Sequence, residues 1–474
     1  MSERIVTIVF LILCLGQLWA LFRGRLTAVI YYICVATLQY FSIWAFVTLD
    51  TARVCGALLV LGGFVLYRQR QKGIPKECYR LLFFFAYIAV ITFAGSLFWP
   101  IEAMSGRSSA YGPLRWVIQV VNWAIIVGVG WQIALALREK DALDKVGRWL
   151  ILLGMFHCAV ALYQVVAFWT DLPLVGIRRV AVGVGLDASD PHLAIASIGG
   201  LPLYRATSFA GEPRSLAAVS MLWIAALITL YYKGRSNTRT HLALLLSLLV
   251  LILTLSTSGW GTFFFCLALM FFLSARQKKS GFLALFLILL LPGVLLTADS
   301  MGWLPGGISV KEVFEERWTQ RMVDPLNDAA VEETLEELSN NPRFIPFGTG
   351  SGGMSFYIAQ NRGGEDLILA STVGWVNYLG DIGLVGILLM IVAMWGGIRN
   401  LLFRRAQCDD VSRHMAFMGC VFLCGTLISA PTYILAFAFG LLLASEYRSK
   451  AMVRSLINSR RALLRTVVKE ERCV

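Results

Sequence analysis

Charge is scarce in this sequence. Asp, Glu, Lys and Arg together make up 15% of its 474 residues, whereas apolar residues make up 58% and the mean hydropathy is +0.70. A chain of this length with so few charged residues is not a string of soluble domains. The shortage of charge instead indicates a protein that lies largely within a membrane.

The residue patterns of most soluble enzymes are also missing. The four histidines are scattered and form no ligand pair, and the sequence contains no catalytic triad, metal-ligand spacing or dinucleotide fingerprint. The ten cysteines form no disulfide framework, and six of them lie in apolar stretches, where cysteine acts as a small hydrophobe. These absences favour chemistry that depends on positioning and charge, without a metal or another cofactor.

Long apolar stretches are abundant. Stretches of eighteen or more apolar residues are long enough to cross a bilayer as helices, and helices satisfy their backbone hydrogen bonds internally. The sequence therefore predicts an all-α fold, a polytopic membrane bundle of about twelve transmembrane helices over residues 1–446. The apolar stretches, eight of which reach eighteen residues, are approximately residues 5–22, 26–49, 53–67, 81–99, 116–137, 149–169, 215–232, 241–256, 259–274, 282–297, 368–395 and 415–446.

Two features refine this bundle. The link at residues 256–261 is very short, so the helices on either side of it should form a tight hairpin. The last stretch is too long for one ordinary span and contains Pro431, which disfavours helix in the residue before it. We expect this stretch to split into two short helices that return the chain to the side it came from. The first stretch has no Ala-x-Ala cleavage site, which favours a retained helix over a removed signal.

The net charge of +13 reports topology and does not indicate nucleic acid as a partner. Its basic residues lie in short links, which mark the cytoplasmic face of membrane proteins. This rule puts three segments outside: residues 100–115, 170–214 and 299–367. The side of the N-terminus stays open, because the basic links at 23–25 and 68–72 cannot both be cytoplasmic if the N-terminus is.

The C-terminal tail, residues 447–474, is basic, with eight Lys or Arg against two Glu. Its apolar residues fall near one helical face, which predicts an amphipathic helix on the anionic inner leaflet. The alternative is a disordered basic tail. In either case we expect the C-terminus in the cytoplasm.

Residues 299–367 are the only extended polar segment, with twelve acidic residues against five basic ones. Arg317 and Arg321 are spaced i, i+4 and would share a helix face. They would help neutralise a diphosphate or bind an acidic sugar, and Trp318 beside them would stack on a sugar ring. The alternative is a solvated helix with salt bridges, in which Trp318 packs the loop.

The second external loop ends with two arginines at the membrane boundary, Arg205 and Arg214, directly before an apolar stretch. A guanidinium presents a rigid fork of donors that suits phosphate oxygens. Glu212 lies between them in the sequence and would orient an arginine or act as a base. The alternatives are ordinary snorkelling of helix-end arginines and a structural salt bridge for Glu212.

Residues 346–353 read Pro-Phe-Gly-Thr-Gly-Ser-Gly-Gly and lead back toward the membrane. Glycines permit close backbone approach and expose amides that can hold an anion, although this stretch lacks the Lys-Ser/Thr ending of a nucleotide-binding loop. Asn377 follows inside an apolar stretch, where an amide usually has a partner or a function.

Three motifs occur in a fixed order. Arg-x-x-Ser-Phe-x-Gly-Glu-Pro-x-x-Leu-Ala begins at Arg205, Leu-Thr-Leu-Ser-Thr-Ser-Gly begins at Leu253, and Phe-Gly-Thr-Gly-Ser-Gly at Phe347 is followed by Val-Asn-Tyr-Leu-Gly-Asp-Ile-Gly-Leu-Val-Gly at Val376. This order, with one large external loop, resembles the bacterial O-antigen ligase and polymerase superfamily. The resemblance covers residues 200–395 by motif and the whole chain by topology.

The resemblance implies a metal-independent glycosyltransferase of the bacterial inner membrane that needs no cofactor. Its donor would be a glycan on undecaprenyl diphosphate, and arginines at the membrane boundary and in the large loop bind this diphosphate in the family. Arg205 matches the first position, and Arg317 or Arg321 matches the second loosely. Glu212 is the candidate for deprotonating the acceptor hydroxyl.

One departure from the family pattern favours the polymerase branch. Ligases typically carry a histidine just before the Asn-x-x-Leu stretch, whereas this chain has Thr-Val-Gly-Trp-Val before Asn377. A polymerase would transfer the growing chain onto the next lipid-linked repeat, and a chain-length regulator is a candidate partner. The alternatives are a ligase that uses lipid A core or protein as acceptor, a flippase of lipid-linked sugars, and an assembly subunit. The sequence shows no internal repeat of the kind that transporters carry.

Overall fold

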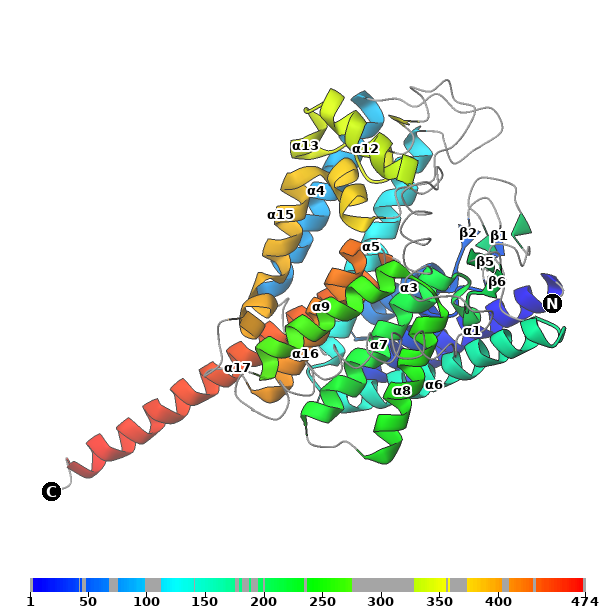
Figure 1. Ribbon diagram of the computed structural model, residues 1–474. Coiled ribbons are helices and arrows are strands. Elements are labelled where there is room, and N and C mark those ends of the chain that lie inside the picture. The colour runs from blue at the N-terminus through cyan, green and yellow to red at the C-terminus, as the bar shows by residue number, and fades with distance from the viewer. Residues whose placement is uncertain are drawn as a thin grey trace.

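The structure is a computed structural model, and the part of the chain that it describes is almost entirely helical (Figure 1), as the sequence predicts. The described residues are 3–41, 43–44, 48–67, 76–98, 112–139, 141–174, 179–180, 187–188, 195–198, 201–233, 237–274, 328–354, 357–358, 373–402, 409–428 and 432–471.

The helices up to the second external loop are α1 (Glu3–Arg23), α2 (Arg25–Ala36), α3 (Thr51–Tyr67), α4 (Lys76–Phe98), α5 (Gly112–Ala136) and α6 (Ala142–Trp169). Those that follow it are the 3-10 turn η4 (Ser208–Ala210), α7 (Pro213–Tyr232), α8 (Thr238–Leu253), α9 (Thr257–Ser274), α12 (Asp328–Asn340), α13 (Phe344–Phe347), α15 (Gly374–Leu402), α16 (Asp410–Ile428) and α17 (Thr432–Glu471). Short strands form three antiparallel pairs: β1 (Ile43–Trp44) with β2 (Thr48–Leu49), β3 (Arg179–Val180) with β4 (Asp187–Ala188), and β5 (Ile195–Ile198) with β6 (Leu201–Tyr204).

Within the described residues, seven helices are long and apolar enough to cross a membrane, namely α1, α4, α5, α6, α7, α15 and α16. Four shorter apolar helices accompany them: α2, α3, α8 and α9. The predicted total of about twelve stays a prediction, because residues 282–297 lie outside the described part of the chain.

Both refinements of the bundle are visible in the structure. α8 ends at Leu253 and α9 begins at Thr257, which is the predicted tight hairpin. The last apolar stretch divides around Pro431, with α16 ending at Ile428 and α17 beginning at Thr432. However, α17 is not short: it runs for 40 residues. The basic tail is its direct continuation and projects from the bundle (Figure 1), and its placement on the inner leaflet stays a prediction.

The prediction of one apolar helix over residues 26–49 is wrong. α2 ends at Ala36, where the Thr37 hydroxyl donates a hydrogen bond back to the carbonyl of Cys34 (2.8 Å). The chain then turns and forms the β1–β2 pair before α3 begins. Hydropathy does not distinguish a helix from a strand hairpin in this stretch, because β-branched and aromatic residues are equally apolar in either structure.

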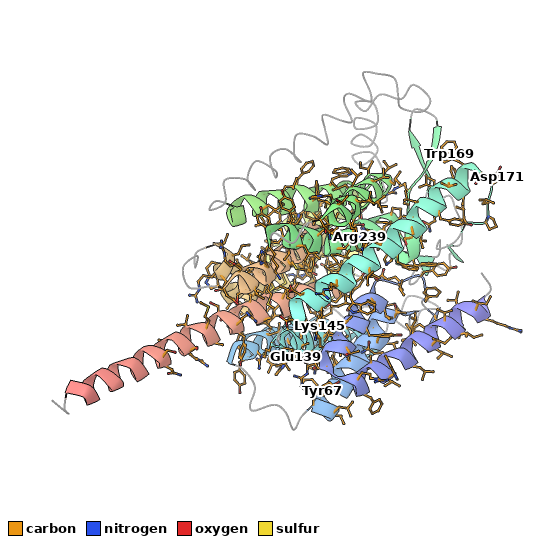
Figure 2. The ribbon with its side chains drawn as sticks, turned by 90° about the horizontal axis from the view of Figure 1, so that it is seen from below. Tyr67, Glu139, Lys145, Trp169, Asp171 and Arg239 are labelled. Carbon is orange, nitrogen blue, oxygen red and sulfur yellow. The ribbon has the colours of Figure 1, made fainter. Side chains whose placement is uncertain are left out.

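The described residues that flank the basic links meet at one end of the bundle, which we call the basic end. Figure 2 shows Lys145 at one end of α6 and Trp169 at the other, with Tyr67 and Glu139 toward the Lys145 end. Contacts between helix ends, and between helix ends and the middle of α17, hold this region together. They are Arg25 over the ring of Tyr67 (4.9 Å), Arg138 over the ring of Tyr447 (3.6 Å), Lys233 with Asp144 (2.5 Å), Arg448 with Asp409 (2.5 Å), and Arg80 with Glu446.

Candidate functional site

The first two sequence motifs come together at the end of the bundle opposite to the basic end, which we call the site end. The backbone N–H of Ala206 donates to the carbonyl of Leu253 (3.0 Å), and Arg205 Nε donates to the carbonyl of Thr254 (3.2 Å). The stretch before α7 is therefore joined to the α8–α9 hairpin. We call residues 204–214 the arginine turn.

The arginine turn leads directly into the N-terminus of α7. Gly211 has a φ of +84°, Glu212 is the extended N-cap residue, and Pro213 occupies the first helical position, where a missing N–H costs no hydrogen bond. Arg214 follows in the first turn of α7, and the side chains of Arg205, Glu212 and Arg214 are all partly exposed. The structure thus places three of the predicted site residues on one turn.

Aromatic side chains surround the middle of the arginine turn. The ring of Phe209 stacks on those of Phe41 (5.4 Å) and Phe156 (5.8 Å), and the N–H of Tyr40 donates to the carbonyl of Phe209 (3.0 Å). These contacts come from the segment after α2 and from α6. The turn is consequently packed into the bundle and is not a free surface loop.

The third motif forms a separate structure, which we call the glycine junction: residues 347–354 packed on residues 380–383. Gly348 (φ +75°, ψ −174°) and Gly383 (φ +66°, ψ −179°) both adopt a backbone conformation that is essentially restricted to glycine, and they lie close to each other. A Cβ on Gly383 would lie 2.5 Å from the backbone carbon of Phe347, and one on Gly348 would lie 2.5 Å from that of Asp381. The two glycines therefore permit the direct backbone contact that the sequence analysis expected here.

The amides of the glycine junction already have acceptors inside the protein. Asp381 accepts from the N–H groups of Gly352 (2.8 Å) and Met354 (3.3 Å), and the Gly380 carbonyl accepts from Thr349 N–H (2.9 Å). The Ser351 N–H donates to the hydroxyl of Thr92 on α4 (3.1 Å). The anion held by this glycine-rich stretch is thus the protein's own carboxylate, which corrects the suggestion that these amides hold an external anion.

The last turn of α16 lies beside the first turns of α15 and α9. It contacts Gly374 at the start of α15 through Leu427, and Gly261 near the start of α9 through Ile428. α15 continues to Asn377 and Asp381, one turn apart, whereas α9 begins immediately after the hairpin that contacts Arg205. The helices that carry parts of the second and third motifs, α9 and α15, are accordingly linked at the site end through the last turn of α16.

The predicted site residues divide into three groups. Arg205, Glu212 and Arg214 lie on the arginine turn, and Asn377 lies near the start of α15, partly exposed. The other predicted residues lie outside the described part of the chain: Arg317, Trp318 and Arg321.

Sequence reasoning missed three residues that hold this end of the bundle. His157 and Gln164 on α6 are fully buried and contact the arginine turn, and Asp381 binds the glycine junction. A signal was present for the first two, because both are polar residues within an apolar stretch. That rule was applied to Asn377, but the histidine was treated only as a possible metal ligand.

Comparison with protein-family models found no matching family, and comparison with curated proteins found no similar sequence.

Proposed function

We propose that this protein is a polysaccharide polymerase of the bacterial inner membrane. It transfers a glycan from undecaprenyl diphosphate onto the next lipid-linked repeat unit, at the periplasmic face. The reaction uses no metal and no cofactor. The proposal rests on the order of the three motifs in the sequence and on their arrangement at the site end.

The proposed orientation places the basic end in the cytoplasm. Basic residues accumulate on the cytoplasmic side of membrane proteins. At the basic end, the ion pairs and the two arginine–tyrosine contacts join six basic links or helix segments. The arginine turn then faces the periplasm. In this orientation α1 begins in the periplasm, so that the links at 23–25 and 68–72 are both cytoplasmic.

Arg205 carries the proposal. Its side chain joins the first two motifs, because its Nε donates to the carbonyl of Thr254 in the hairpin. Arg214 adds a second guanidinium in the first turn of α7, where the positive end of the helix dipole also favours an anion. Two arginines beside a helix N-terminus form a suitable environment for a diphosphate at the membrane boundary.

In the proposed reaction, a hydroxyl of the acceptor sugar attacks the anomeric carbon of the donor glycan. The bond between that carbon and the diphosphate oxygen breaks, and undecaprenyl diphosphate leaves with the electron pair. Glu212 accepts the proton of the attacking hydroxyl, while Arg205 and Arg214 stabilise the charge that develops on the leaving diphosphate. Two other carboxylates near this end have structural partners: Asp50 binds Arg53 (3.2 Å) and Asp381 binds the glycine junction.

The absence of a histidine before Asn377 favours polymerase over ligase, since the ligase branch typically has its candidate base there. The position of the charges favours an enzyme over a flippase. In the described residues, the ion pairs lie at helix ends or where the apolar part of α17 gives way to its basic tail, whereas transporters typically carry ionisable groups near the bilayer midplane.

The test uses purified protein in lipid with undecaprenyl-diphosphate-linked repeat units as the only substrate. Polymerisation gives a ladder of products on a gel. Arg205→Ala should lower the rate about tenfold to a hundredfold, the effect expected for losing a charge-assisted hydrogen bond. Arg239→Ala is the matched control, because Arg239 is an exposed arginine in a basic link (Figure 2) and should leave the rate unchanged.

Two other results would replace the proposal. Transfer that occurs only after lipid A core or a protein acceptor is added would identify a ligase. If no transfer occurs and lipid-linked sugar instead crosses the bilayer of sealed vesicles, the protein is a transporter.

A further inference from the structure

Two polar side chains, His157 and Gln164, lie on one face of α6 within the membrane-spanning bundle. They are seven residues apart, so they fall about two turns apart on the same face, and both are fully buried. Polar groups at such positions are costly unless they have partners. The partners of both residues include Ser208 in the arginine turn.

Gln164 binds the backbone of the arginine turn. Its Oε1 accepts from the N–H groups of Thr207 (3.1 Å) and Ser208 (2.7 Å), and its Nε2 donates to the carbonyl of Ser208 (3.4 Å). One side chain thus satisfies both donors and an acceptor of a buried turn. An apolar side chain at this position would leave all three without these partners.

His157 binds the side chain of the same serine. Its Nδ1 lies 2.9 Å from Ser208 Oγ, and its Nε2 lies 3.1 Å from Thr37 Oγ1. Because the Thr37 hydroxyl donates to the carbonyl of Cys34, it accepts from Nε2–H, and Nδ1 therefore accepts from the Ser208 hydroxyl. The imidazole ring also stacks on Trp223 of α7, with 5.6 Å between ring centroids and 12° between planes.

Ser208 has an unusual backbone conformation. Its φ is +48°, in the left-handed region that residues with a Cβ rarely adopt. Such conformations persist only where the surroundings enforce them, and here Gln164 and His157 supply that constraint. Ser208 lies three residues after Arg205 and four before Glu212, so its φ sets the relative direction of the two chain segments that carry these residues.

We infer that His157 and Gln164 are positioning residues for the diphosphate site. They hold Ser208 in the left-handed conformation, and this conformation brings Arg205 and the N-terminus of α7 to the same ligand. The inference rests on the proposed function, since it assumes that the arginine turn binds a diphosphate. It assigns to α6 a role in ligand binding that the three sequence motifs do not contain.

The most direct test compares Ser208→Ala with Ser208→Gly. Both variants lack the hydroxyl that binds His157, but only glycine adopts a positive φ without strain. We expect Ser208→Ala to bind undecaprenyl diphosphate about fivefold to thirtyfold more weakly than Ser208→Gly, which should remain close to the unaltered protein. Binding is measured on the full chain in lipid nanodiscs with undecaprenyl diphosphate itself, so no glycan transfer is needed.

A second pair tests the histidine. Phenylalanine at 157 retains the stacking on Trp223 and removes both hydrogen bonds, so His157→Phe should weaken binding, and Ser208→Gly in the same chain should restore it. KM for the lipid-linked donor should follow the dissociation constant while kcat changes less. His414→Phe is the matched control, because His414 is a buried histidine on α16 near the basic end and its replacement should leave binding unchanged.

Equal binding by the two Ser208 variants, or tighter binding by the alanine variant, would overturn the inference. So would a folded His157→Phe protein that binds normally, since this would show that only ring packing matters. Arg205→Ala in the same assay separates this failure from that of the proposed function. If Arg205→Ala also binds normally, the diphosphate does not bind at the arginine turn and the proposed function fails first.

Discussion

The arginine turn and the glycine junction lie at the same end of the bundle, and each depends on backbone with positive φ. In the glycine junction these positions are glycines, Gly348 and Gly383, for which the conformation carries no steric cost. In and beside the arginine turn they include Ser208 and Leu255, both with φ of +48°. The glycine junction reaches positive φ with residues that lack a side chain, whereas the arginine turn and the adjoining hairpin also hold residues with side chains at positive φ.

This difference separates scaffold from site. Residues in sparsely populated backbone conformations tend to occur at active sites and ligand clamps, where the surroundings enforce them. The arginine turn fits that description, because Gln164 and His157 act directly on Ser208. The glycine junction has its amides bound internally and joins α4 to α15, as a structural connection does. Variants in the arginine turn should accordingly change ligand binding, whereas variants in the glycine junction should change stability.

The largest effect on stability is expected for Gly383→Ala. Alanine at this φ and ψ costs about 1–3 kcal/mol in backbone strain, and its Cβ would meet the Phe347 backbone at 2.5 Å, which adds to the loss. The measurement is thermal unfolding in detergent. Gly147→Ala is the control, because no atom lies within 4 Å of a Cβ there and alanine favours helix. If both variants unfold alike, the glycine junction does not depend on close backbone contact.

Much of the scaffold could be predicted from sequence, because apolar length and Pro431 report directly on helices and their ends. The location of the three motifs at one end of the bundle could be anticipated only from their order in the sequence. The roles of Gln164 and His157 could not, since their partners lie more than forty residues away in the chain and no local pattern encodes that contact. Asp381 belongs to the third motif, but the hydrogen bonds that its carboxylate accepts from residues 352 and 354 form only when the glycine junction is folded.

An intermediate effect is expected for Asp381→Asn. The amide offers one acceptor oxygen in place of two, so one of the N–H groups of Gly352 and Met354 loses its acceptor, at a cost of about 1–3 kcal/mol. Unfolding temperature should fall, while undecaprenyl diphosphate binding by the protein that remains folded should not change. A selective loss of binding would place the ligand at the glycine junction and reverse the assignment of site and scaffold.

Asp409→Asn at the basic end is the matched control for Asp381→Asn. Asp409 accepts from the N–H of Ser412 (3.0 Å) and from Arg448, and although burial raises its pKa, these hydrogen bonds lower the pKa overall. The carboxylate is thus equally engaged in holding the fold, at the opposite end of the molecule. Its replacement should also lower stability, and it should leave polymerisation by the folded protein intact.

The smallest effect is expected at Leu255, the second strained residue, which follows the carbonyl that accepts from Arg205. Leu255→Gly and Leu255→Ala both remove the leucine side chain, but only glycine relieves the strain at a φ of +48°. The gain is partly offset by the greater unfolded-state entropy of glycine, so glycine should be more stable than alanine by at most about 1 kcal/mol. Chemical denaturation of the pair measures this difference. Glycine would then be more stable than alanine both at 383 and at 255, although only position 383 has glycine in the natural sequence. A more stable alanine variant would show that Leu255 carries no strain, and the contrast between the two regions would then depend on Ser208 alone.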